Sequence, residues 1–367
     1  MISKTSTLPA LPSTFIRPQS DQALHAFQFV SHWQTVFAEG INRLSHHYAQ
    51  GEDLQTTIWL RDQGQHGGGW RREGTDQGLL NRGSLNVSCV HYDDLPEKKL
   101  ASATALSCIL HPIHPYAPSL HTHISWTELK GGKGGWRLMA DLNPSHPNEE
   151  DRLYFIEQLK QSFKDIDQSV VTRALEEGDR YFKIPALERH RGVAHFYLEQ
   201  WNSGDFKADL NLAHTFAQHV IQTYLFLFEK ALKTTPLSAV PLSAYQTQLD
   251  YHSLYFFQVL TLDRGTSSGL LVHQDNDLGI MGSLPHHMNR PLLSSWIAKL
   301  PFPQDTLLDS LIQVLPKHPP YTLKPDVRLK LAQCVRKHYK VHPDALALQA
   351  RGSILPPTVS NHRSNNS

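Results

Sequence analysis

The sequence predicts an α+β protein in which a largely antiparallel β-sheet is flanked by helices on both sides, within a single domain. Three segments carry apolar residues at helical spacing, and five others alternate apolar and polar residues as strands do. Two of the strand-like segments are joined by the glycine-rich connection 130–135, which allows the positive φ values of a tight turn. Helices around strands that include a hairpin are typical of an antiparallel sheet covered by helices.

The elements follow from these patterns in chain order. The predicted helices are Gln22–His47, Glu149–Lys164 and Asp209–Lys233, the last with Asp209 as its N-cap. The predicted strands are Ser84–His91, Ala103–His111, Leu120–Leu129, Trp136–Leu142 and Tyr255–Arg264. No repeat or Ser/Gly linker divides the middle of the chain, so we expect one domain over residues 21–347. Residues 1–20 and 348–367 are rich in Pro, Ser, Thr and Asn and are expected to be a disordered leader and a disordered tail.

The composition of the 367-residue chain excludes several classes of protein. Apolar residues make up 40% and charged residues 19%, so the bulk of the chain is not disordered. The 35 Lys and Arg almost balance the 34 Asp and Glu, and this balance gives no support to a nucleic-acid partner. The longest apolar run, Tyr224–Phe228, is far shorter than the roughly 20 residues that span a bilayer. We therefore expect a protein without a membrane span.

The compartment is inferred from the cysteines and the leader. The three cysteines are widely spaced and form no CxxC, which favours a reducing, cytoplasmic location over a disulfide framework. The leader lacks the apolar core of a secretory signal. Lys4 and Arg17, with no acidic residue before Asp21, would suit an organelle transit peptide, but we favour a plain disordered leader. Cys89 and Cys108 lie in strand patterns and are expected in the core.

Alternation along the strands gathers polar residues on one face. The members of this polar set are His121, His123, Ser125, Arg137 and Asp141, with Ser107 and His111 sharing a face of their own strand. A face so rich in His, Ser, Asp and Arg either floors a pocket or meets water, since antiparallel sheets permit a solvated face. A further alternative is a divalent metal held by His111, His121 and His123.

Three other patterns carry less specific information. Residues 64–72 (GQHGGGWRR) lack the endings of phosphate-binding loops and are expected to form a mobile lid or a plain loop. His214 and His219 are five positions apart in a predicted helix and are interpreted as structural. Asp263 and Arg264 end an apolar segment, where they form either a strand-end ion pair or a base beside an anion anchor.

Six segments between residues 59 and 285 together resemble the oxygen-dependent coproporphyrinogen III oxidases. Residues 67–72 followed by SLNVSCVH are similar to the family's GGGxxR loop and its GVNxSxVHG-like strand. ALSCILHPIHPYAPSLHTHIS resembles GVSxVxHPxNPxxPxxHxNxR, and GWRLMADLNPSH followed by EED resembles the family's FDLTPxY and EED. Tyr181-Phe182 to Arg191-Gly192 is similar to YF and RGxGG, and DRGTSSGL with SLPH resembles DRGTxFGL with SLPP.

The resemblance implies a homodimer that acts on a small molecule by oxidative decarboxylation. In the family, O₂ removes two propionate carboxylates of coproporphyrinogen III, giving vinyl groups, CO₂ and hydrogen peroxide in haem biosynthesis, with no organic cofactor. Carried over, the resemblance implies that Asp141 or Asp263 is the base, Arg264 the carboxylate clamp and His121 a proton relay. The residues expected to bind substrate are Asn86, Ser88, Ser107, His123, Ser125 and His273.

The chain also departs from the family pattern at positions that would bind substrate carboxylates. The arginine of HxNxR is Ser125 here, and the glycine pair plus arginine before SLPP are replaced around His273–Asn276. Arg137 and His195 are new polar groups. Two alternatives to the family activity therefore stay open. One is a related O₂-dependent oxidase, with or without a metal, that acts on a different carboxylate. The other is a non-catalytic tetrapyrrole-binding protein.

Overall fold

The structure is a computed structural model that describes residues 9–273 and 276–351. Residues 1–8, 274–275 and 352–367 lie outside the described ranges, so most of the expected tail and part of the expected leader and of the loop 273–276 fall there. The described chain is α+β, built around one antiparallel sheet, which confirms the expected fold class. No helix within these ranges is both long enough and apolar enough to cross a bilayer.

The sheet has seven strands in the order β1-β2-β3-β4-β5-β6-β9, and every neighbouring pair is antiparallel. The strands are β1 (Gln55–Leu60), β2 (Gly67–Gln77), β3 (Leu80–His91), β4 (Leu100–Pro112), β5 (Ser119–Leu129), β6 (Gly134–Asn143) and β9 (Ala194–Trp201). The first four predicted strands are β3 to β6, each longer than predicted. The β5–β6 connection is the predicted hairpin, with positive φ at Gly131 and Gly132.

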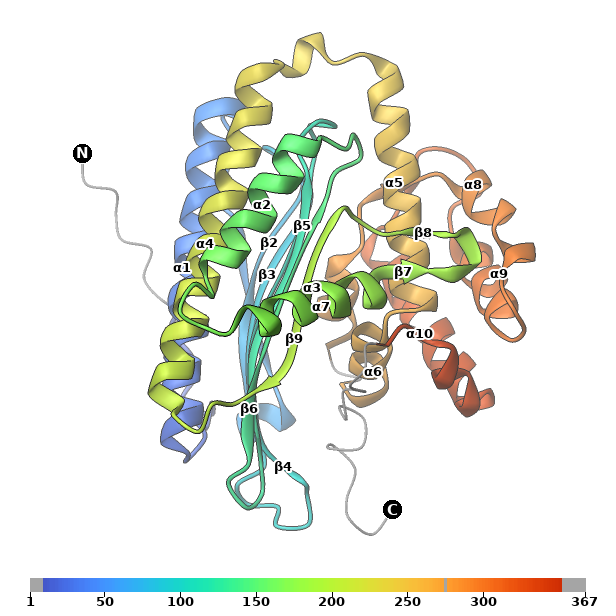
Figure 1. Cartoon of the computed structure of the whole chain (residues 1–367). Helices are drawn as coiled ribbons and strands as arrows, with labels where there is room; N and C mark the ends of the chain where they lie inside the picture. The colour runs from blue at the N-terminus through green and yellow to red at the C-terminus, as the bar shows by residue number, and fades with distance from the viewer. Residues whose placement is uncertain (1–8, 274–275, 352–367) are drawn as a thin grey trace.

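Helices cover both faces of this sheet, as Figure 1 shows. On one face lie α1 (Asp21–Ala49), α2 (Glu149–Gln161) and α4 (Phe206–Thr234), while α3 (Gln168–Phe182) packs against β9. The opposite face is covered by α5 (Leu242–Thr261), α6 (Arg264–Val272), α7 (Asp277–Ile280), α8 (Arg290–Ser295), α9 (Gln304–Val314) and α10 (Pro325–Val341). Two short strand pairs complete this side: β7 (Lys183–Ile184) with β8 (Arg189–His190), and β10 (His287–Met288) with β11 (Tyr321–Thr322).

The main core lies between the apolar face of the sheet and the helices α1, α2 and α4. Trp126 and Trp136 of β5 and β6 pack there with Leu106 and Leu138. Cys89 and Cys108 are also fully buried in this core, as predicted. Burying each large apolar side chain contributes about 1.5–3 kcal/mol, so this face gives the sheet its fixed position against the helices. The opposite, polar face is thereby assigned to the second helical layer.

One predicted strand is wrong: residues 255–261 belong to helix α5, and Asp263 is the N-cap of α6. From Tyr251 to Thr261 every residue of α5 is buried, because this helix lies between the sheet and the C-terminal helices. A helix that is buried on all sides carries apolar residues on all sides and loses its 3.6-residue period. A short apolar run without that period cannot be distinguished from a buried strand by pattern alone.

The glycine-rich segment 64–72 was also interpreted wrongly, since most of it forms β2 rather than a loop or lid. β2 is an inner strand paired with both β1 and β3. A methyl group at Gly69 would overlap the carbonyl oxygen of Val87 on β3, so the glycine permits close backbone approach within the sheet. Glycine therefore serves strand packing here.

The N-terminus of α4 differs from its prediction by one turn. Asp205, not Asp209, caps the helix, and its carboxylate accepts from the backbone N–H groups of Lys207 and Ala208. The Asp209 side chain instead accepts from Trp201 Nε1 at 2.8 Å. His219, also on α4, contacts Gln158 O, which agrees with its structural interpretation.

Candidate active site

The polar face of the sheet does not meet water; it forms the floor of a cavity. Strands β3 to β6 supply the floor, and α3, β9, α5 and α6 supply residues of the walls. The cavity volume is about 280 Å³. Small-molecule sites commonly enclose ~300–1000 Å³, so this cavity is at the lower end of the range for an organic ligand. The alternating pattern therefore assigned the polar and apolar faces correctly. The polar face is enclosed because helices cover it.

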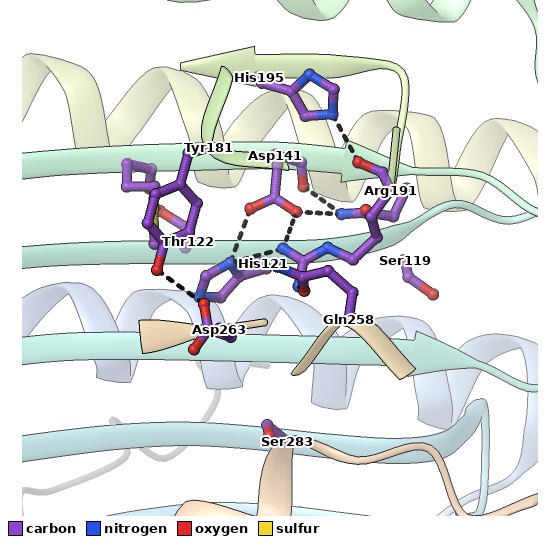
Figure 2. A network of polar contacts seen from close by, with 12 residues as sticks. Ser119, His121, Thr122, Asp141, Tyr181, Arg191, His195, Gln258, Asp263 and Ser283 are labelled. Carbon is purple, nitrogen blue, oxygen red and sulfur yellow. Dashed lines mark hydrogen bonds and ion pairs between the residues drawn. The ribbon is translucent and has the colours of Figure 1, made fainter. Parts of the chain in front are cut away.

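His121 and Asp141 form a hydrogen-bonded pair at the centre of this floor. They are directly opposite each other on β5 and β6, and His121 Nδ1 lies 2.7 Å from Asp141 Oδ1 (Figure 2). His121 lines the cavity, whereas Asp141 is 0% exposed and lies behind it. Asn143 donates to the other carboxylate oxygen at 2.6 Å. The pair thus holds the imidazole with Nδ1 towards Asp141 and leaves Nε2 for the cavity.

Arg191 completes the support of this pair, although it was not among the predicted site residues. Its Nη2 donates to Asp141 Oδ2 at 2.7 Å and its Nη1 to Gln258 Oε1 at 2.6 Å (Figure 2). The guanidinium lies between two rings, 4.4 Å from the centroid of Phe182 and 4.7 Å from that of Tyr255. The RGxGG-like segment was the signal that could have identified it.

The charge of Asp141 is maintained by its partners. Burial alone would raise the pKa of this carboxyl group, but the Arg191 guanidinium, the His121 ring and the Asn143 hydrogen bond together hold the pKa well below its usual value. The same pairing raises the pKa of Arg191 although burial opposes the change. A buried, fully ionised carboxylate with no cavity surface acts on the site through His121 rather than by contact with a ligand.

Asp263 and Arg264 reach the cavity from the helical side. Asp263 caps α6, with Oδ2 accepting from Thr266 N at 2.7 Å, and its Oδ1 accepts from Tyr181 OH at 2.8 Å. The neighbouring Arg264 donates to Leu346 O at 2.9 Å and makes no ion pair with any other described residue. Both side chains line the cavity because a helix begins between them. A helix N-terminus therefore stands where the sequence predicted the end of a strand.

Ser125 and Arg137 are directly opposite each other on β5 and β6. Ser125 stands where the family pattern has an arginine, and Arg137 occupies the opposite position on the adjacent strand. Arg137 is held by Glu199 of β9, through Nε to Oε2 at 2.6 Å and Nη2 to Oε1 at 3.1 Å, and Tyr197 OH also donates to this carboxylate. Arg137 lines the cavity, but its charge is balanced by Glu199. This network from β9 was not predicted.

The remaining residues expected to bind substrate divide into two groups. Asn86, Ser107, His123 and His273 line the cavity. Ser88 and Ser125 do not reach the cavity wall. Burial lowers the pKa of His123 well below its usual value, assisted by Arg137, and burial together with Arg61 lowers the pKa of His273 to about 4. Both rings are therefore neutral near pH 7 and offer hydrogen bonds rather than charge.

The three histidines considered as metal ligands do not converge. His111 is buried, with Nδ1 3.0 Å from Ser119 Oγ and Nε2 3.1 Å from Ser283 O. His121 has its Nδ1 on Asp141, and His123 is two positions further along the same strand. Among the residues that the structure describes, these three form no group with ligand atoms within 4.8 Å of one another.

Comparison with known proteins gives matches to one family. A family model described as coproporphyrinogen III oxidase matches residues 26–295. The chain is 25% identical over 288 residues to the mitochondrial oxygen-dependent coproporphyrinogen-III oxidase of Rattus norvegicus, a match that covers 73% of this chain and 62% of the rat protein. It is 24% identical over 281 residues to the oxygen-dependent coproporphyrinogen-III oxidase of Rickettsia akari (strain Hartford), covering 70% of this chain and 96% of that protein.

Proposed function

Because this chain belongs to the coproporphyrinogen III oxidase family, we propose that it is an oxygen-dependent oxidase that converts coproporphyrinogen III to protoporphyrinogen IX in haem biosynthesis. In each of the two decarboxylations a hydride equivalent leaves the CH₂ next to the ring, and the bond to the carboxylate carbon breaks. The electron pair of that bond forms the vinyl double bond, CO₂ departs, and O₂ accepts the hydride and a proton to become H₂O₂. The names of the rat and Rickettsia relatives support this reaction class.

The observation that carries the proposal is the cavity that His121 enters from the sheet and Asp263 and Arg264 enter from the helices. A porphyrinogen is electron-rich, so the protein has to exclude bulk solvent, take a proton from a pyrrole N–H and orient a propionate. We assign proton abstraction to Asp263, because its carboxylate lines the cavity and Asp141 is fully enclosed. Arg264, which has no ionic partner among described residues, orients the departing carboxylate.

His121 and Asp141 complete the assignment. His121 presents Nε2 to the cavity, where it can relay a proton to or from the substrate or reduced oxygen. Asp141 is the positioning residue for that ring, since it contacts Nδ1 and not the cavity. The proposal needs O₂ as co-substrate and no organic cofactor; a divalent metal stays an alternative. We further propose a homodimer in the cytoplasm, which sedimentation velocity of the purified chain and fractionation of source cells would test.

A second candidate is favoured by the charges of the cavity. Of its three arginines, Arg137 is balanced by Glu199 and Arg191 by Asp141, which leaves Arg264 to face a substrate carboxylate. Coproporphyrinogen III carries four carboxylates, and their burial without cationic partners is costly. A related oxidase reaction on a substrate with fewer carboxylates would suit these charges. The first of the two proposed decarboxylations leaves a product with three carboxylates. This tricarboxylate is the probe that tests the second candidate.

The test is a product assay on the full chain. The protein is mixed anaerobically with coproporphyrinogen III, exposed to air, and the vinyl products are separated by chromatography. Protoporphyrinogen above the autoxidation control supports the proposal. Turnover of the tricarboxylate alone moves the assignment to the second candidate. Tight binding without product identifies a non-catalytic tetrapyrrole-binding protein, and neither binding nor product contradicts the family reaction.

A further inference from the structure

Asp76, near the end of β2, lies beside His286 and His287 at the start of β10. Their potential ligand atoms lie within 4.8 Å of one another. His287 Nε2 is 2.8 Å and His286 Nε2 is 3.3 Å from the same atom, Asp76 Oδ2. Asp76 and His287 also line a second cleft of about 950 Å³, which shares no lining residue with the candidate active site. We propose that these three side chains bind a divalent transition-metal ion, Zn²⁺ being the ion best matched to them.

The separations suit direct coordination. Zn²⁺ binds imidazole nitrogens and carboxylate oxygens at about 2.0–2.2 Å, so neighbouring ligands of a tetrahedral ion lie about 3.3 Å apart. His286 Nε2 and Asp76 Oδ2 have this separation, and His287 requires a shift of about half an ångström. Three protein ligands leave a fourth position for a water molecule or an anionic ligand, and two of the three, Asp76 and His287, border the second cleft.

The hydrogen bonds of His287 are compatible with metal binding through Nε2. The Thr322 hydroxyl lies 3.3 Å from both Pro320 O and His287 Nδ1. When the hydroxyl donates to Pro320 O, its oxygen can accept from Nδ1–H, and the Nε2 lone pair is then available to a metal ion beside Asp76 Oδ2, which is 2.8 Å away.

The backbone of both histidines is held in place without a metal. Asn81 Oδ1 accepts from the backbone N–H of His286 at 2.8 Å. His252 Nδ1 donates to His287 O at 3.1 Å, and His287 pairs with Thr322 in the β10–β11 ladder. The ligands therefore come from segments that are already fixed against each other. A site with such support loses little conformational entropy when the ion binds.

The ligand types and surroundings select the ion. Two imidazoles and one carboxylate match Zn²⁺ and its neighbours in the transition series, whereas Mg²⁺ and Ca²⁺ need more oxygen ligands. The positively charged Arg82 and Arg328 act on His286 electrostatically. Their charge opposes any cation, but it opposes ions held by electrostatic attraction alone more than ions that bond strongly to nitrogen. This inference does not depend on the proposed oxidase activity.

Zn²⁺ titration of the chelator-treated full chain, followed by calorimetry and equilibrium dialysis, tests the proposal. We expect one Zn²⁺ per chain, with affinity reduced at least about 10-fold in H287Q and in D76N. Since the chain has 23 histidines, H46Q is the matched control, because His46 makes a single exposed contact with Asp53 and no group of three. Its affinity should equal that of the wild type.

Co²⁺ provides a second readout that reports geometry. The wild-type chain loaded with Co²⁺ should show the intense visible bands of low coordination number, and D76N and H287Q should lose them. Asp76 is an exposed residue near the end of β2, so D76N tests the site even where H287Q fails to fold. Saturable one-to-one binding that survives in D76N and H287Q, or that is lost equally in H46Q, would overturn the proposal, as would the absence of saturable binding.

Discussion

His121 Nδ1 and Asp141 Oδ1 lie 2.7 Å apart across the β5–β6 ladder, and only the histidine reaches the cavity. Asp141 is also bound by Arg191 and Asn143, so both of its oxygens are occupied. The family resemblance allowed Asp141 or Asp263 as the base. The geometry supports Asp263 in that role and Asp141 as the residue that orients His121.

Asp141→Asn should destabilise the fold in a pH-dependent way. The substitution removes the negative charge that pairs with the buried Arg191. Leaving that guanidinium without a counter-charge should lower the free energy of unfolding by about 3–5 kcal/mol. Because the folded-state pKa of Asp141 is depressed, its contribution to the free energy of unfolding is present above the ordinary Asp pKa of about 3.9 and is lost as pH falls towards the folded-state pKa.

Urea unfolding of wild type and variant across pH measures this contribution. The difference in unfolding free energy should be constant from about pH 5 to 8 and should narrow below about pH 4. Asp53→Asn, which breaks only an exposed contact with His46, is the control and should change stability by less than about 1 kcal/mol. A difference that is absent at pH 7, or that widens as the pH falls, would contradict the assigned charge state.

His121→Asn should separate catalysis from stability. The Asn amide can still donate to Asp141 from a position close to that of Nδ1, but Nε2 is removed. We expect turnover to fall at least about 100-fold, with a change of a few degrees in Tm. His219→Asn on the outer helix α4 is the matched control and should keep full turnover. Equal turnover in both variants would remove His121 from the proposed relay.

Glu199→Gln should increase the effective charge of the cavity. Gln keeps a hydrogen-bond acceptor for Arg137 but no longer balances its charge. KM for coproporphyrinogen III should therefore fall several-fold at low ionic strength, and the gain should shrink as salt is added. Glu177→Gln, which breaks an exposed pair with Arg180, should leave KM unchanged. An unchanged KM in Glu199→Gln would show that Arg137 does not face the substrate.

Asp263→Asn isolates the proposed base, because Asn is as good an N-cap as Asp and should preserve α6. We expect turnover to be abolished while Tm stays within a few degrees of wild type. Asp205→Asn makes the same change at the cap of α4, away from the cavity, and should retain activity. Substantial turnover in Asp263→Asn, measured as vinyl product, would exclude this carboxylate as the base.

Much of the sheet could be predicted because its faces differ. Apolar residues such as Leu120 and Ile124 alternate with His121 and His123, so strand, face and hairpin partner all follow from a period of two. The pairing of His121 with Asp141 follows in turn from the short 130–135 connection. By contrast, Tyr255 belongs to a helix buried on all sides, where neither period survives.

The site was predicted only as far as the strands and motifs reach. Whether the polar face was solvated depended on α5 and α6, whose placement no local pattern encodes. Arg191 and Glu199 act through contacts with residues 50 and 62 positions away, which sequence spacing does not reveal. His111, His121 and His123 were suggested as metal ligands because of the strand faces that they occupy. The sequence does not show which partner each ring nitrogen contacts. Those contacts depend on Ser119, Ser283 and Asp141.

The most direct test of the central claim is the stoichiometry of the reaction in a sealed chamber. Purified protein and coproporphyrinogen III are combined with a known amount of O₂, and O₂ uptake, CO₂ release and vinyl product are measured together. The proposed reaction consumes one O₂ and releases one CO₂ for each vinyl group, above the rate without protein. O₂ uptake that yields only aromatised porphyrin, with no CO₂, would contradict the assignment of this chain as a decarboxylating oxidase.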